Sequence, residues 1–461
     1  MTNLKVLISG ASVAGPALAY WLHRHGFQPT VVERAPALRD GGYAVDFRGE
    51  AHLTVLRRMG ILADLERVRT GTGSMSYVNS AGKPQAELPA DLFAGDIEIL
   101  RGDLARILYD ATRQHTEYVF GDSITSLTED ADGVTVSFEH GAPRRFDLVI
   151  GADGLHSTTR RLAFGPEEEF VKHLGVHCAI FTTANHLGLD HTGHAYRTAG
   201  KLVALHSARH NAEARAVFYF AAPQLDVDRR DVARQQALLA ETFAGNGWES
   251  DRLLQDMRYA PDFYFDSVGQ VHMDTWSRGR VALIGDAAYC PSSLSGMGSG
   301  LALVGAYVLA GELAAARGDH RVAFARYEEE MREYAVGCQK MGDGVAKLMV
   351  PGNRALPRSS TAITRSCRTC RARTWPPRAP ARPRRTSRSA TTVNMPGGKR
   401  TEESSPRPRD LDAAMVHARS EPFHGSTAQR KLAVKRKSRD HRCCLPWLAE
   451  GRAWSSSGCF L

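Results

Sequence analysis

Two glycines and one acidic residue near the N-terminus have the types and spacing that suit dinucleotide binding. Gly10 and Gly15 bound the segment Gly-Ala-Ser-Val-Ala-Gly, and Glu33 follows eighteen residues after Gly15. The first glycine permits a tight turn and the last allows close helix–strand packing, while the helix N-terminus directs unpaired N–H groups at a pyrophosphate. An acidic residue at the position of Glu33 accepts hydrogen bonds from a ribose and repels a 2′-phosphate, which favours FAD or NAD over NADP.

The elements that must position these residues can be read from the same stretch. Residues 4–9 are mostly apolar, an Ala-rich segment follows the turn, and Pro29-Thr-Val-Val-Glu33 resembles a second strand. Ser12 occupies the usual place of a middle glycine, and ordinary loops also carry glycines at such spacings. The order strand, turn, helix, strand and acid therefore supports the βαβ interpretation more strongly than the glycines alone.

Two later strands are predicted to end in aspartate. Residues 146–151 form an apolar run before Asp153 and Gly154, and residues 279–284 form another before Gly285 and Asp286. Ligands of open α/β sheets gather at the carboxyl ends of strands, so both aspartates are candidate site residues. The alternative for Asp153 is to cap the helix that follows.

A glycine-rich loop from Pro291 to Gly300 precedes a small-residue helix over 301–316. A loop with so few Cβ atoms lets backbone N–H groups approach a flat or anionic ligand; tight helix packing would explain the small residues of the helix but not those of the loop. Arg101 opens another predicted helix, where a cation opposes the helix dipole. We expect it to have an anionic or carbonyl partner, or else to be a solvated surface residue.

The positive charge of the chain lies entirely in its C-terminal part. Residues 354–461 contain 20 Arg and 4 Lys against 7 acidic residues, whereas residues 1–353 contain 35 basic and 43 acidic residues. The acidic body gives no electrostatic support to nucleic-acid binding. Its three cysteines are too few for a disulfide framework, which suits the cytoplasm. We expect no signal peptide and no membrane segment, because the first strand begins at once and the longest apolar run carries Glu312.

Residues 354–461 are rich in Arg, Pro, Ser and Thr and have no hydrophobic period, so we expect a disordered basic tail. Such a composition is typical of GC-rich DNA translated in the wrong frame, and we hypothesise a frameshift near residues 353–357. The alternative gives the tail a function of its own: an inactive chain whose basic runs bind nucleic acid or an anionic membrane.

Residues 175–270 are rich in short β-like runs, interrupted by a helix expected from Asp231 to Phe243. Aromatic and histidine side chains are frequent here, either as core or as the lining of a ligand cavity. No pair of histidines has metal-binding spacing, so no metal site is predicted.

With GASVAG, GADG and GDAA in this order, the chain resembles the class A FAD-dependent aromatic monooxygenases. These are related to para-hydroxybenzoate hydroxylase and to the tetracycline-inactivating monooxygenases, and the resemblance covers about residues 4–349. It implies an α/β fold with a Rossmann-like FAD-binding domain of the GR2 type and an inserted, mainly β substrate domain. The resemblance implies that residues 1–174 form the first part of the FAD-binding domain, and that residues 74–98 are a candidate contribution to the substrate sheet. Residues 175–270 would form the substrate domain. Residues 271–353 would form the second part of the FAD-binding domain with the C-terminal helices, and the tail would follow.

The resemblance also implies roles for individual residues. FAD would be bound tightly and without a covalent bond, and NAD(P)H would bind transiently at Arg39 and Asp153. The flavin carries the chemistry in this family, so no catalytic side chain is assigned. The residues expected to hold FAD are Gly10, Ser12, Ala14, Gly15, Glu33, Arg34, Asp46, Arg101, Asp153, Gly285, Asp286, Gly296 and Gly298.

Departures from the family pattern lie near the expected flavin. Tyr289 replaces a frequent histidine, Ser292 and Ser293 stand where relatives often have proline, and Gly300 stands where many have asparagine. These changes affect the expected hydrogen bonding of the flavin ring.

The implied activity is a monooxygenase reaction in which NAD(P)H, O₂ and a flavin C4a-hydroperoxide hydroxylate an aromatic or polyketide-like small molecule. Baeyer–Villiger oxygen insertion and a flavin reductase are alternatives on the same fold, and a halogenase is disfavoured because its Trp-x-Trp-x-Ile-Pro motif is absent. We expect a monomer or homodimer.

Overall fold

The computed structural model describes residues 3–38, 43–90, 95–208 and 211–350, all within one compact unit of the chain. The expected disordered tail and the candidate nicotinamide contact Arg39 lie outside the described residues.

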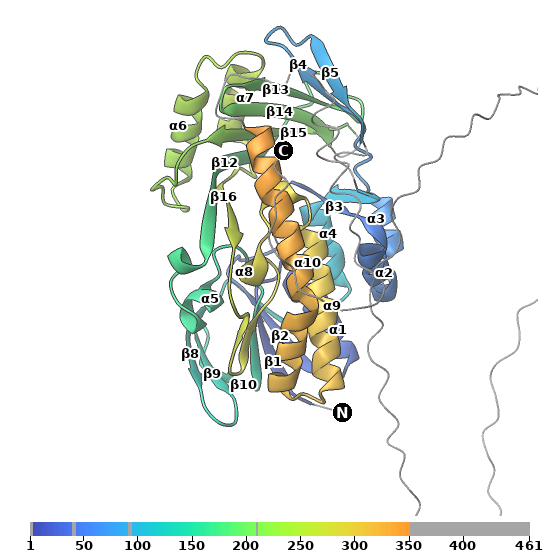
Figure 1. Cartoon of the computed structure of the whole chain (residues 1–461), viewed down its shortest axis with the longest axis vertical. Helices are drawn as coiled ribbons and strands as arrows, with labels where there is room; N and C mark the ends of the chain where they lie inside the picture. Colours follow the sequence, from blue (N-terminus) through green and yellow to red (C-terminus); the bar gives the residue numbers. More distant parts are fainter. Residues whose placement is uncertain (1–2, 39–42, 91–94, 209–210, 351–461) are drawn as a thin grey trace, which may run out of the picture. The chain divides into compact units, whose positions relative to one another are not determined.

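A six-stranded sheet forms the centre of the nucleotide-binding part (Figure 1). Five neighbouring strands are parallel and the edge strand β17 is antiparallel. The parallel pairing of β1 with β2 across α1 confirms the predicted βαβ unit. The order is β17 (Ser277–Arg278), β18 (Val281–Leu283), β11 (Leu148–Gly151), β1 (Lys5–Ser9), β2 (Gln28–Glu33) and β7 (Glu117–Phe120).

Both faces of this sheet are covered, which explains why its central strands are largely apolar. Val6 and Ile8 of β1 belong to the core shared with the helices, whereas Leu7 belongs to a separate core. That second core is completed by an antiparallel meander. Its strands are β8 (Ile124–Glu129), β9 (Val134–Phe138) and β10 (Arg144–Phe146).

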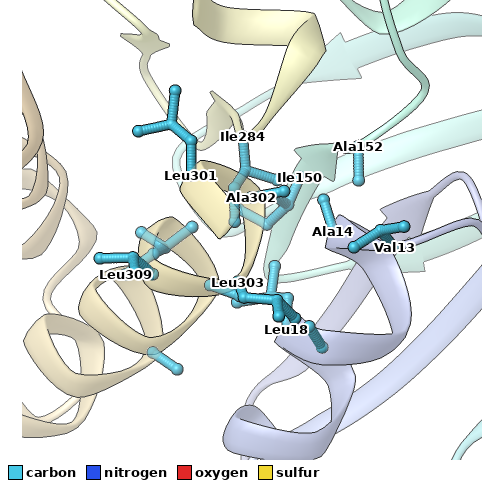
Figure 2. Packing of buried hydrophobic residues seen from close by; sticks show 14 of the residues in the cluster. Val13, Ala14, Leu18, Ile150, Ala152, Ile284, Leu301, Ala302, Leu303 and Leu309 are labelled. Carbon is cyan, nitrogen blue, oxygen red and sulfur yellow. The ribbon is translucent and has the colours of Figure 1, made fainter. Parts of the chain in front are cut away.

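Helix α1 (Ala14–Arg24) packs against α9 (Gly298–Ala315), and α10 (His320–Met349) packs along α9. Figure 2 shows Leu18 of α1 and Leu303 of α9 side by side, with Ala14 and Ala302 near Ile150. Within the described part of the chain, α9 is the one helix long and apolar enough to cross a membrane, and 56% of it is buried inside the protein. Its small residues allow this close packing.

The part of the chain expected to hold the substrate is built on a seven-stranded sheet. Two of its strands, β4 and β5, come from the first hundred residues, and β4 pairs in parallel with β13. Helices α6 (Val232–Phe243) and α7 (Ser250–Asp256) cover one face, and Asp231 caps α6. The strand order is β16 (Tyr264–Val271), β12 (Val171–Thr183), β15 (Glu213–Ala221), β14 (Lys201–Ala208), β13 (Gly193–Thr198), β4 (Met75–Val78) and β5 (Pro84–Leu88).

The opposite face of this sheet carries an apolar cluster that includes Ile180 and Val217, and Tyr43 and Met349 pack against this cluster. The end of α10 therefore reaches the substrate sheet, as Figure 1 shows. The side chains of this face alternate along the strands with those that pack under α6 and α7.

The remaining elements connect these layers. Leu53, Leu56, Met59 and Leu62 follow the spacing of a single helix, but the structure divides this stretch, because Gly60 adopts φ +76° and ends α2 in a left-handed cap. The strands β3 and β6 form an antiparallel pair. The bounds are β3 (Ala44–Phe47), α2 (Gly49–Met59), α3 (Leu62–Arg67), β6 (Ile97–Leu100), α4 (Arg101–Asp110), α5 (Thr158–Ala163), α8 (Asp286–Tyr289), and the 3₁₀ helices η2 (Glu167–Glu169), η3 (Met257–Tyr259) and η4 (Ser293–Ser295).

Candidate cofactor and substrate site

The turn between β1 and α1 accepts only glycine at its two ends. Gly10 has φ +107°, and a Cβ there would lie 2.5 Å from the Ala152 carbonyl oxygen. A Cβ on Gly15 would lie 1.9 Å from the Gly10 carbonyl oxygen. Helix α1 then begins at Ala14 with no side-chain cap and no acidic residue in its first turn. Its N-terminal N–H groups are thus available to an anion.

Glu33 lies at the end of β2, next to this turn. Its Oε2 accepts a 2.8 Å hydrogen bond from the Ala11 N–H, and its Oε1 accepts one of 2.9 Å from the Ala35 N–H. A carboxylate has lone pairs for further donors, so it can also accept the hydroxyls of a ribose. Arg34, the next residue, is exposed.

Arg101 reaches the glycine turn from the start of α4. Its guanidinium donates a 2.9 Å hydrogen bond to Ser12 Oγ, and it lies over the Tyr43 ring at 5.8 Å from the centroid. The expected anionic or carbonyl partner is therefore a hydroxyl in this structure. Burial acts to lower the pKa of Arg101, but the neighbouring ionisable groups, first Tyr43 and Tyr264 and then Asp286 and Glu33, outweigh it and raise that pKa overall.

Asp286 and the glycine loop meet on the other side of the turn. Gly285 has φ +64°, and a Cβ there would lie 3.2 Å from the Ala14 Cβ. A Cβ on Gly298, the first residue of α9, would lie 3.5 Å from Asp286 Oδ1. Burial raises the pKa of Asp286, and the charge of Arg101 opposes the shift. Like α1, α9 has no acidic residue in its first turn.

Asp46 lies beside the same loop. A Cβ on Gly296 would lie 3.6 Å from Asp46 Oδ2, and that oxygen accepts a 3.0 Å hydrogen bond from Arg48 Nε. Burial raises the pKa of Asp46 to about 6, although Arg48 acts in the opposite direction. A carboxyl group with this pKa changes its charge near neutral pH.

Asp153 is held by protein groups around α5. Its Oδ2 accepts hydrogen bonds of 2.9 Å from both the backbone N–H and the hydroxyl of Thr159, and one of 3.3 Å from Ser9 Oγ. Its Oδ1 accepts from Ser157 Oγ. Asp153 thus accepts one N–H of the first turn of α5, whose N-cap is Ser157, and the cofactor contacts of Asp153 stay a prediction.

The sequence comparisons agree with this geometry. A model of the FAD binding domain family matches residues 3–338. The chain belongs to this family. A flavin-dependent monooxygenase of Legionella longbeachae is 43% identical over 349 residues, which cover 75% of this chain and 89% of the relative. The chain is therefore a class A FAD-dependent monooxygenase.

Two further proteins place this monooxygenase among its relatives. An uncharacterised protein of Mycobacterium tuberculosis is 49% identical over 358 residues, covering 76% of this chain and 95% of the relative. The crystal structure of the tetracycline destructase Tet(55) superimposes with a TM-score of 0.73 at 41% identity. That match covers 80% of this chain and 96% of the destructase.

The residues of this monooxygenase fit FAD. The turn at Gly10 and Gly15 has no room for a side chain, and α1 begins without a side-chain cap. The ribose-binding candidate Glu33 and the candidates Arg101, Asp286 and Gly298 surround this turn from four different elements.

Several polar residues of the monooxygenase near this site were not predicted. His52 is fully buried beside Gly300, where a Cβ would lie 2.1 Å from its Cε1. Tyr264, Asp266 and His156 form a hydrogen-bonded chain between β16 and the segment after β11. Their positions in sequence carry no local motif, since their partners are far away along the chain.

Proposed function

We propose that this monooxygenase uses NAD(P)H and O₂ to insert one oxygen atom into a planar aromatic or polyketide-like small molecule. In the balanced reaction NAD(P)H, a proton and O₂ are consumed, one oxygen atom enters the substrate, and the other leaves as water. Bound FAD would supply the redox chemistry, accepting a hydride from the nicotinamide and activating O₂.

The single observation that carries the proposal is the position of the substrate sheet relative to the FAD cradle. Tyr43 packs against the apolar cluster of the sheet that includes Ile180 and Val217, and its ring also lies under the Arg101 guanidinium that binds Ser12. One tyrosine thus connects the sheet to the turn that would hold the cofactor. The apolar side chains on this face suit a flat, largely apolar molecule.

The proposed roles of the chain are binding, orientation and exclusion of water. Gly10, Gly15 and the start of α1 would hold the pyrophosphate, Glu33 the ribose, and Asp286 with the loop at Gly296 and Gly298 the remainder of FAD. The solved tetracycline destructases make tetracyclines a reasonable first group of polyketides to test.

The proposal is tested with purified full-length chain loaded with FAD. Addition of a tetracycline or a naphthol should stimulate both NAD(P)H oxidation and O₂ uptake, and mass spectrometry should find a product heavier by one oxygen atom. NAD(P)H oxidation with a reduced organic product and no stoichiometric O₂ uptake would indicate the reductase alternative. Failure of soluble chain to bind FAD would contradict the proposal at its first step.

A further inference from the structure

Tyr264, the first residue of β16, is attached to a chain of ionisable side chains. Its hydroxyl donates a 3.0 Å hydrogen bond to Asp266 Oδ2. The same carboxylate oxygen lies 3.1 Å from His156 Nε2, and His156 Nδ1 lies 2.9 Å from Glu167 Oε1. Four side chains therefore connect the substrate sheet with η2 of the FAD-binding part.

The neighbours of His156 determine where the protons are. Both ring nitrogens face carboxylates, so a charged imidazolium donates in both directions. Burial acts to lower the pKa of His156, but the hydrogen bonds with Asp266 and Glu167 outweigh it and raise that pKa. Burial acts to raise the pKa of Asp266, yet His156 and the Ser267 N–H keep it below its usual value. Asp266 is therefore ionised and can only accept hydrogen bonds.

The Tyr264 hydroxyl must consequently give its single proton to Asp266. A phenolic oxygen that donates its proton in this way keeps its lone pairs for another donor. Within the described part of the chain, no other group is hydrogen-bonded to this oxygen. Toward its surroundings Tyr264 thus presents an acceptor.

The position of Tyr264 indicates which molecule would meet this acceptor. Tyr264 lies directly opposite Ile180 in the antiparallel pairing of β16 with β12, so the two side chains are on the same face of the sheet. This is the face that contacts Tyr43. Tyr264 is 37% exposed, yet burial among protein groups raises the pKa of its hydroxyl well above the ordinary value, and the charge of Arg101 acts in the opposite direction. The Tyr264 ring is therefore accessible at the face of the sheet that also contacts Tyr43, whose ring lies beside the Arg101 guanidinium.

We propose that Tyr264 is a specificity-determining residue that accepts a hydrogen bond from a donor on the substrate, such as a phenolic or enolic hydroxyl. Asp266 is the positioning residue that orients the tyrosine proton, and His156 and Glu167 hold Asp266. The assignment rests on the proposed function, because it requires a planar aromatic substrate beside the sheet.

The test compares two probes that differ in one donor, 1-naphthol and 1-methoxynaphthalene, by calorimetric titration of FAD-loaded protein. Wild-type protein should bind the naphthol about tenfold more tightly, the effect of one hydrogen bond. Tyr264→Phe should remove most of this preference without changing the FAD content. Tyr196→Phe is the matched control, because Tyr196 lies on another strand and contacts Trp248.

Asp266→Asn gives a second, opposite test. In the wild-type protein the Ser267 N–H donates a 2.7 Å hydrogen bond to Asp266 Oδ1. The side-chain carbonyl of the asparagine would accept this bond in its place, and the side-chain amide would donate to the Tyr264 hydroxyl. The tyrosine proton would then point to the probe, so the preference should shift toward 1-methoxynaphthalene. If Asp266 had only a structural role, Asp266→Asn would weaken the binding of both probes equally.

The possible failures are distinct. FAD-loaded protein that binds both probes alike, or a Tyr264→Phe variant that keeps the naphthol preference, overturns the hydrogen-bond assignment alone. FAD-loaded protein that binds neither probe overturns the assignment and the aromatic substrate class together. Loss of FAD from soluble wild-type protein contradicts the proposed function itself.

Discussion

The guanidinium of Arg101 donates a hydrogen bond of 2.9 Å to the hydroxyl of Ser12, 89 residues earlier in the chain. This contact ties the start of α4 to the glycine turn before α1. Glycine, the usual residue at this place in the fingerprint, has no side chain to accept such a bond. Ser12 stands where the fingerprint usually has glycine, and Arg101 stands at a helix start, where a cation is unfavourable. The hydrogen bond between them gives a reason for both residues.

Ser12→Ala should weaken FAD binding about tenfold, because a hydrogen bond to a charged group contributes on the order of 1.5–3 kcal/mol and the arginine would lose its anchor. Quenching of FAD fluorescence on titration with apoprotein measures the dissociation constant. Ser126→Ala, at an exposed position of β8, is the control and should leave it unchanged. Equal affinities of wild type and Ser12→Ala would show that the contact does not organise the cofactor site.

Two glycines of α9 should respond in opposite ways to alanine. At Gly300 a Cβ would lie 2.1 Å from the ring of His52, so Gly300→Ala should lower the free energy of unfolding by about 1–3 kcal/mol. At Gly311 no atom lies within 4 Å of the new Cβ, and Gly311→Ala should stabilise the protein by up to about 1 kcal/mol. Urea denaturation measures both. A stabilising Gly300→Ala would mean that His52 can leave its position at no cost.

His52 should make the protein less stable in acid. Its Nδ1 accepts the Arg48 N–H at 3.0 Å, its Nε2 lies 2.6 Å from the Tyr334 hydroxyl, and burial lowers its pKa to about 4. The unfolded chain binds a proton near pH 6.5 and the folded chain does not, so stability falls as the pH decreases from about 6.5 to about 4.

His52→Gln removes this titration. The free energy of unfolding of wild type should fall more steeply than that of the variant, by up to about 1.4 kcal/mol per pH unit, below pH 6.5. Denaturation series at several pH values give both slopes. Parallel slopes would mean that His52 is protonated in the folded protein.

Two buried tyrosines, Tyr289 at the end of α8 and Tyr327 of α10, should differ in their contribution to stability. The Tyr327 hydroxyl lies 3.1 Å from the Leu283 carbonyl oxygen and 2.9 Å from the hydroxyl of Tyr289. Tyr327→Phe leaves both groups unpaired and should cost about 1–3 kcal/mol, whereas Tyr289→Phe leaves the bond to Leu283 intact and should cost less. Chemical denaturation of the two variants gives the order, and a reversed order would exclude this hydrogen-bond arrangement.

The local parts of the structure could be predicted from the sequence. The turn at Gly10, the helix from residue 14 and the strand ending at Glu33 follow from backbone conformation and residue pattern within about thirty residues. The division of α2 from α3 does not follow from the apolar spacing of this stretch, because it depends on the left-handed conformation of Gly60.

The contacts between distant segments could not be predicted. His52 meets Tyr334 across 282 residues, and His156 meets Asp266 across 110. Such pairs depend on how layers pack, and neither partner carries a periodic or motif signal. Tyr264 could be noted only as one of many aromatic residues in a β-rich stretch.

The parallel pairing of β4 with β13 has a consequence for building hybrid enzymes. A hybrid that takes its substrate specificity from a relative must receive two separate pieces of gene, one encoding residues 75–88 and one encoding residues 171–271. Transfer of the second piece alone would join a foreign β13 edge to a resident β4, with mismatched side chains along the seam. Recombination points that respect this pairing should yield more folded hybrids than points chosen from a continuous stretch of sequence.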